Sequence, residues 1–185
     1  MPFAFASGLN LYATIAVLGL VQRFELVALP PQFEPFGHPV VIGVAVALYL
    51  IEFVADKIPW VDSIWDAIHT VVRPVGGAVV AITALGAPSP GMDALAGVLG
   101  ASVALATHLT KAGTRAAVNT SPEPVSNWIL SFVEDLVAIG LVYFATEHPV
   151  IALAITLFLL TLILTFATVL FRFVRRRFTP RRAAA

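Results

Sequence analysis

The segment Pro149–Phe171 reads PVIALAITLFLLTLILTFATVLF and contains no charged side chain. A helix needs about 20 apolar residues to cross the hydrocarbon core of a bilayer. Backbone amides find no water there, so a segment of this composition must form an α-helix. The stretch therefore predicts a transmembrane helix, and its lack of a polar face places it at the lipid-facing edge of a bundle.

Composition supports the same conclusion for the whole chain. Of 185 residues, 59% are hydrophobic and 12% are charged, whereas soluble domains are about 25% charged. We therefore expect the lipid bilayer as a partner. The formal net charge of zero argues against a nucleic-acid partner. With no cysteine, disulfides and thiol catalysis are excluded, and we expect no cleaved signal peptide because no basic region precedes the first apolar residues.

Five further hydrophobic segments precede the one quoted above. The first is short for a full span, so we expect a half-helix, a tilted helix or a re-entrant segment. The third is interrupted by Arg73-Pro74 and Gly76-Gly77. We predict an all-α, polytopic transmembrane bundle with about six hydrophobic segments. The five are approximately Gly8–Val21, Pro39–Ala55, Ile64–Leu85, Met92–Leu109 and Val125–Ala145.

Basic residues predict the orientation. A run of arginines follows the last segment, and such runs remain on the cytoplasmic side. We therefore predict a transmembrane domain over residues 1–172, a basic cytoplasmic C-terminal tail over 173–185, and a multi-pass protein of the inner (plasma) membrane. The arginines are Arg172, Arg175, Arg176, Arg177, Arg181 and Arg182.

A faint internal similarity suggests a repeat. Ser63-Ile64-Trp65 is followed by Gly77, and Ser126-Asn127-Trp128 is followed at the same distance by Gly140. Many transporters consist of two such repeats. Chance explains two tryptophan matches equally well, so both explanations stay open.

An acid-rich motif occupies residues 49–74. Glu52 and Asp56 are four apart, and the polar side chains from Asp62 to Arg73 recur at intervals of three or four, so each of these two groups shares one face of a helix. A charge at membrane depth costs about 2.5–3.5 kcal/mol, so each face must meet protein, water or a ligand. The residues are Glu52, Asp56, Asp62, Asp66, His69 and Arg73.

A base-rich motif occupies residues 107–124 and shows the same spacing in His108, Lys111, Arg115 and Asn119. The fifth segment then adds two adjacent acids, Glu134 and Asp135. In the predicted topology both motifs lie at the cytoplasmic side, so we expect acids and bases to meet there. A third polar stretch, Ala6–Thr14, contributes Asn10 and Tyr12 as secondary candidates, with Ser7 as a helix cap and Gly8 allowing close approach. A simple interfacial cap with Tyr12 in the aromatic belt explains that stretch as well.

Three interpretations of the charged residues stay open. They form a salt-bridge network that only joins helices, a polar pathway for an ion, proton or small solute, or a phosphate or lipid-headgroup site at Arg73, Lys111 and Arg115. We favour a transporter or channel, with proton coupling through the acids and histidines. The second candidate is a protein that binds lipid headgroups or modifies lipids, and the third is a structural membrane scaffold. A chain of this length suggests a homodimer.

Chemistry beyond binding has little support in the sequence. We expect no cofactor. A metal at Asp62, Asp66 and His69, or at Glu52 and Asp56, stays open, although no metal signature matches. The hydrolase, metalloprotease and phosphate-loop motifs are absent from the sequence. An enzyme is therefore not the favoured class, although an intramembrane hydrolase or transferase using Asp, His and Lys stays open.

Three motifs together resemble an uncharacterised bacterial integral membrane family that is known only as a domain of unknown function. They are ASGLNLY at residues 6–12, DKIPWVDSIWDAIH at residues 56–69 and KAGTRAAVNTSPEP at residues 111–124. The resemblance covers nearly the whole chain except the arginine-rich tail. It implies an integral membrane protein of this size, and it carries over no activity.

Overall fold

The computed structural model describes residues 1–86, 89–120 and 125–178, and every regular element in those ranges is helical. This confirms the all-α class. Parts of two predicted features, the end of the base-rich motif at Ser121–Pro124 and the end of the arginine tail at residues 179–185, lie outside the described residues. The elements are α1 (Pro2–Leu9), α2 (Leu11–Arg23), the 3₁₀ helix η1 (Pro31–Gly37), α3 (Pro39–Ala55), α4 (Pro59–Leu85), α5 (Pro90–Val118), α6 (Val125–Glu147) and α7 (Pro149–Phe178).

The number of helices that can cross a membrane is smaller than the six predicted segments. Among the described residues, α4, α5, α6 and α7 are long and apolar enough, and η1 with α3 makes a fifth candidate that is bent by 63°. The first predicted segment is divided between α1 and α2, which have 8 and 13 residues. At 1.5 Å per residue, neither reaches across the hydrocarbon core.

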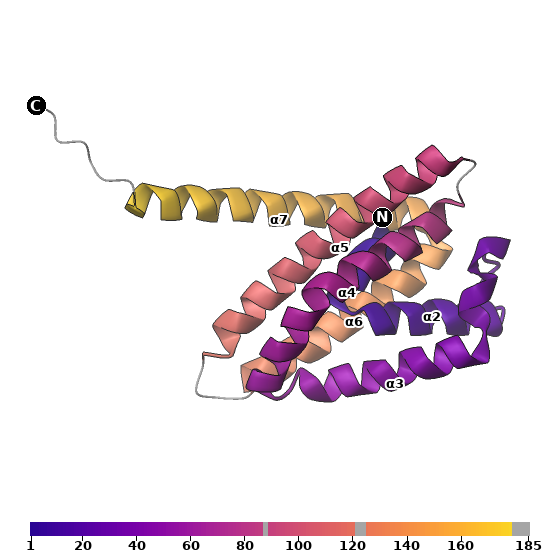
Figure 1. Cartoon of the computed structure of the whole chain (residues 1–185), viewed down its shortest axis with the longest axis horizontal. Helices are drawn as coiled ribbons and strands as arrows, with labels where there is room; N and C mark the ends of the chain where they lie inside the picture. Colours follow the sequence, from indigo (N-terminus) through magenta and orange to yellow (C-terminus); the bar gives the residue numbers. More distant parts are fainter. Residues whose placement is uncertain (87–88, 121–124, 179–185) are drawn as a thin grey trace, which may run out of the picture.

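The first segment forms two short helices, and we call α1 with α2 the N-terminal helix pair. α1 and α2 meet at Asn10. Met1 lies beside Leu85 at the end of α4, and Arg23 lies beside Pro39 at the start of α3. Because α3 and α4 are joined at their opposite ends, both outer ends of the pair lie at one end of the bundle (Figure 1).

The break between α1 and α2 is set by Asn10. Its backbone is extended, with φ −151° and ψ 102°, and its side-chain oxygen accepts a hydrogen bond of 2.9 Å from the Ala13 amide. This is an N-cap for α2. The prediction that Ser7 caps a helix is wrong, because the Ser7 hydroxyl donates to the Phe3 carbonyl within α1.

The part of the acid-rich motif from Asp62 to Arg73 lies on one continuous helix. α4 runs unbroken from Pro59 to Leu85, with Pro74 inside it. Pro59 occupies the first turn, where its missing N–H costs no hydrogen bond. α1 lies against α4, α5 and α6, so the first helix of the N-terminal helix pair fills the centre of the bundle.

The last helix behaves as the sequence predicts. In Figure 1, α7 begins against the other helices and runs away from them toward the left. Only 11% of its apolar window is buried inside the protein. Lipid is the natural surrounding for so long an apolar surface.

Two glycines allow the backbones of α4 and α5 to touch. A Cβ placed on Gly100 would lie 2.6 Å from the Gly77 carbonyl oxygen and closer still to the Ala81 side chain. We expect Gly100→Ala to lower the melting temperature in detergent micelles, since the helices must separate to accept the methyl group. Gly113, on the same helix with open space around it, is the matched control. Gly113→Ala is expected to be neutral or stabilising, and an equal loss in both variants would contradict close α4–α5 packing.

A buried charge cluster between four helices

The acid-rich and base-rich motifs meet, as the sequence predicts, where α3 ends, α4 begins, α5 ends and α6 begins. Their charged side chains are buried, with exposed fractions between 0 and 7%. We call these residues the charge cluster. Its carboxyl groups are Glu52, Asp56, Asp62, Asp66, Glu134 and Asp135, and its cations are Arg73, Lys111 and Arg115.

Arg73 on α4 joins three elements. One guanidinium nitrogen donates to Glu52 Oε1 on α3 at 2.6 Å, and the other donates to His108 Nδ1 on α5 at 2.8 Å. The second nitrogen also donates to the Gly8 carbonyl oxygen at 3.1 Å and lies 3.8 Å from Asp66. The planar fork of arginine suits this multiple bonding.

Lys111 on α5 has three carboxylate partners. Its ammonium lies 3.1 Å from Asp56 Oδ2 and 3.5 Å from both Glu52 Oε1 and Glu134 Oε2. It also donates to the Leu9 carbonyl oxygen at 3.0 Å. One ammonium thus joins α1, α3 and α6 to α5.

Arg115, one turn further along α5, makes the largest number of these contacts. Its Nε and Nη2 donate to Glu134 Oε2 at 3.0 and 2.8 Å, and Nη2 also donates to Asp56 Oδ2 at 2.8 Å. Its Nη1 donates to Asn127 Oδ1 at 2.8 Å. Asn127 was not among the predicted site residues, although its spacing of seven from Glu134 places both on one helical face.

Asp56 lies in the turn between α3 and α4 and shows what the cations do. Burial alone would raise the pKa of its carboxyl, but Lys111 and Arg115 hold that pKa below its ordinary value. Asp56 is therefore ionised at neutral pH. The neighbouring Lys57 points elsewhere, with its ammonium 3.1 Å from the centre of the Phe53 ring, and burial lowers its pKa.

The split helix gives the cluster two backbone ends of opposite polarity. The carbonyl oxygens of Gly8 and Leu9, at the C-terminus of α1, accept from Arg73 and Lys111. The N-terminus of α2 is presented to an acid, because the Asn10 amide donates to Asp135 Oδ1 at 2.9 Å. Each end thus meets the charge that a helix dipole favours.

The two histidines have different surroundings. His108 Nε2 lies 3.0 Å from the Asp66 carbonyl oxygen, which can only accept, so Nε2 carries the proton and Nδ1 accepts from Arg73. His108 is thereby held neutral. His69 lies beside the cluster, with Nδ1 2.7 Å from the Trp65 carbonyl oxygen and Nε2 3.0 Å from the hydroxyl of Tyr12, the other secondary candidate.

A cleft of about 190 Å³ reaches the cluster between α4 and α5. Asp62, Asp66 and Arg115 line it on one side of the cluster. Asn119, the last predicted residue of the base-rich motif, also lines it and donates to Asp62 Oδ2 at 2.7 Å. The cleft brings Asp62, Asp66 and Arg115 of the cluster to the surface of the protein.

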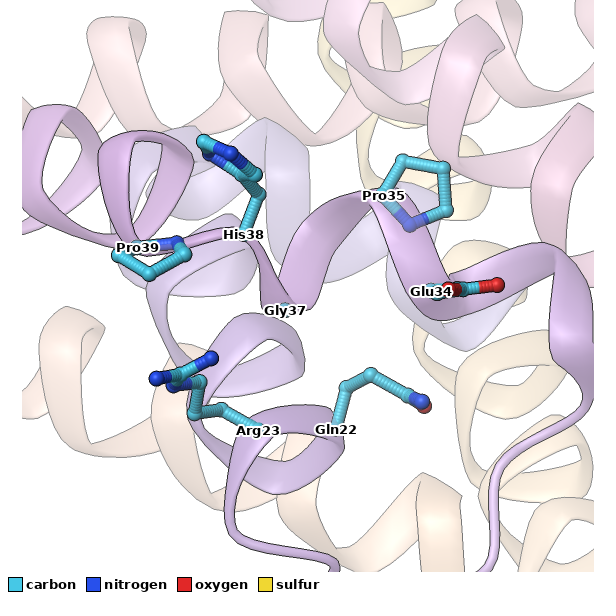
Figure 2. A pocket seen from close by; sticks show the side chains of 7 residues that line it. All are labelled: Gln22, Arg23, Glu34, Pro35, Gly37, His38 and Pro39. Atoms are coloured by element: carbon cyan, nitrogen blue, oxygen red, sulfur yellow. The ribbon is translucent and has the colours of Figure 1, made fainter.

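A second cleft, of about 490 Å³, lies at the opposite end of α3 (Figure 2). Figure 2 shows Gln22 from α2 extending toward Glu34 of η1, whereas Arg23 extends toward Pro39, next to His38 at the start of α3. Its charged side chains are exposed, in contrast to those of the cluster.

Metal binding finds no geometric support among the described residues, where no three His, Asp or Glu side chains are placed to hold an ion. The sequence candidates Asp62, Asp66 and His69 do not converge, because the His69 nitrogens bond to Trp65 and Tyr12.

Comparison with protein families matches residues 1–168 to a domain of unknown function (DUF4126). The chain belongs to this family. The match covers every element that contributes to the charge cluster and agrees with the resemblance seen in the sequence motifs. Comparison with curated proteins and with solved structures gives no match, so the DUF4126 family adds no activity to what the geometry shows.

Removal of one cation should expose the energetic role of the cluster. Arg115→Leu leaves Glu134 and Asp56 short of a partner, which typically costs about 3–5 kcal/mol, and we expect a marked fall in the melting temperature in lipid nanodiscs. Adding Glu134→Gln to Arg115→Leu should restore part of the loss, because one unpaired charge disappears. Arg23→Leu, at an exposed arginine, is the control, and an equal effect there would show that charge pairing is not responsible.

Proposed function

We propose that this membrane protein transports a small solute or ion, with protons or cations bound in the charge cluster. The supporting observation is an imbalance of charge. Among the described residues, six carboxyl groups are buried there with three permanent cations. If Lys57, at the edge of the charge cluster, is counted as a fourth cation, two of the six carboxyl groups are still in excess.

An uncompensated charge is costly in a low-dielectric interior. The histidines do not remove this excess, because His108 accepts from Arg73 and is held neutral. The excess must therefore be neutralised by protons or cations taken from water. Groups that gain and lose positive charge inside a membrane are the working parts of proton-coupled and ion-coupled transporters.

Two features of the fold support this proposal. The cleft lined by Asp62 and Asp66 gives the cluster a connection to the surroundings. The break at Asn10 places the ends of α1 and α2 against the charges. Discontinuous helices whose ends face charged groups are typical of ion-coupled transporters.

The structural scaffold is the second candidate, and one observation favours it. Five of the six carboxyl groups lie within 4.0 Å of a cationic nitrogen of Arg73, Lys111 or Arg115. Pairing of this kind alone would join the helices. The charge imbalance favours transport, because a purely structural network needs no unpaired acid.

A lipid-headgroup site at the cluster has less support. Lys111 and Arg115 are 3% and 1% exposed, and both already contact carboxylates. A phosphate would have to displace those carboxylates.

The proposal also includes location and oligomeric state. Location in the inner membrane with a cytoplasmic C-terminus rests on the arginine run. Assembly as a homodimer rests on the chain length.

Proton flux into proteoliposomes tests the proposal. Vesicles loaded with potassium and a pH-sensitive dye are diluted into potassium-free buffer with valinomycin. Potassium efflux makes the interior negative, and protons are the probe. We expect faster acidification than in protein-free vesicles and a large loss of that rate in Asp62→Asn, whose carboxyl lines the cleft. Glu147→Gln, an exposed acid at the far end of α6, should behave as wild type. Equal rates with and without protein would count against proton movement.

A further inference from the structure

Asp135 is the carboxyl group of the charge cluster that contacts none of its three cations. It is 4% exposed, and within the described ranges it forms no ion pair with lysine, arginine or histidine. Its Oδ1 accepts from Asn10, whereas its Oδ2 is buried without a hydrogen-bond partner. The Tyr49 hydroxyl on α3 faces the same carboxyl group. A buried carboxylate with no cation in contact is the one that a proton would stabilise most.

We propose that Asp135 is the group that takes up and releases a proton in the cluster, and that Asn10 is the residue that positions it. The proposal names the proton-binding residue of the proposed transporter, and its biological role rests on the proposed transport function. Proton binding itself can be measured without any transport, so the two can fail separately.

The surroundings of Asp135 contain opposing charges. Two carboxylates favour the protonated form of Asp135, and two ammonium groups favour its ionised form. A group between such opposing influences can change state at accessible pH. The titratable and charged groups facing Asp135 are Tyr49 and Glu52 from α3, Asp56 and Lys57 from the α3–α4 turn, and Lys111 from α5.

A proton fits this site better than a metal cation. Hard cations such as Ca²⁺ require six to eight oxygen ligands and Mg²⁺ requires about six. Among the described residues no three acidic or histidine side chains are placed to hold an ion. One open carboxylate oxygen, Oδ2 of Asp135, is sufficient for a proton.

Proton uptake at Asp135 would act directly on the helix break. The Asn10 side chain donates to Asp135 Oδ1 and accepts from the Ala13 amide, both at 2.9 Å. A hydrogen bond to an ionised carboxylate is about twice as strong as one between neutral groups, and the N-terminus of α2 favours a negative charge. Protonation therefore weakens the hold on Asn10 and loosens the first turn of α2.

Infrared difference spectroscopy on the full chain in liposomes tests proton binding. The spectra follow the carbonyl band of protonated carboxyl groups as the pH is varied. We expect one titrating component to disappear in Asp135→Asn and to persist in Glu147→Gln. In Asn10→Ala the midpoint should move to higher pH, by on the order of one unit, because a donor to the ionised form is lost.

Two results would overturn the proposal: an unchanged titration in Asp135→Asn, or an unchanged midpoint in Asn10→Ala. If Asp135→Asn does not fold, Asp135→Glu serves instead, and its component must titrate with a different midpoint. Hydrogen exchange of residues 11–14 measures the coupling to α2. Faster exchange in Asp135→Asn than in Glu147→Gln is expected, and equal exchange would refute the positioning role of Asn10. If the titrations behave as expected but the wild-type protein moves no protons in the flux experiment, the transport function is rejected and proton binding at Asp135 stands.

Discussion

Arg73, Lys111 and Arg115 must neutralise a larger number of carboxyl groups inside an apolar bundle, and the arrangement of the helices depends on this constraint. Lys111 and Arg115 on α5 each reach acids on at least two other elements, and Arg73 on α4 reaches Glu52 on α3. The helices α3, α4, α5 and α6 are thereby joined at one end. A set of apolar helices in lipid has little hydrophobic reason to choose one arrangement over another. Charge pairing supplies that choice, and the cost of breaking one pair makes the arrangement specific.

The split helix supplements the three cations with backbone groups. Carbonyl oxygens at the end of α1 act as additional acceptors for Arg73 and Lys111, and Asn10 at the start of α2 provides a donor to Asp135. An unbroken helix would bond those carbonyl groups internally and could offer none of them. In a continuous membrane helix these main-chain groups bond only to one another. The break makes them available to the charged side chains of the site.

The sequence predicted much of the site because charged residues in an apolar chain are conspicuous and helical spacing assigns them to faces. The stripe from Asp62 to Arg73 and the steps from His108 to Arg115 were predicted in this way. Partners of the charges were harder to predict. The Gly8 and Leu9 carbonyl groups have no side-chain signature, and the link from Asn10 to Asp135 spans 125 positions. The number of crossings was overestimated because hydrophobicity alone does not show that a chain turns back at a single asparagine.

The position of the N-terminal helix pair has a consequence for how the protein is made. α1 and α2 are synthesised before the helices they contact, yet α1 lies against α4, α5 and α6. Asn10 and Ser7 are fully buried in the finished protein, but Asn10 has no Asp135 to bind until α6 has been made. The Asn10 side chain therefore gains its acidic partner only after α6 has been synthesised. The contacts of α1 with the bundle are likewise complete only once α4, α5 and α6 are present.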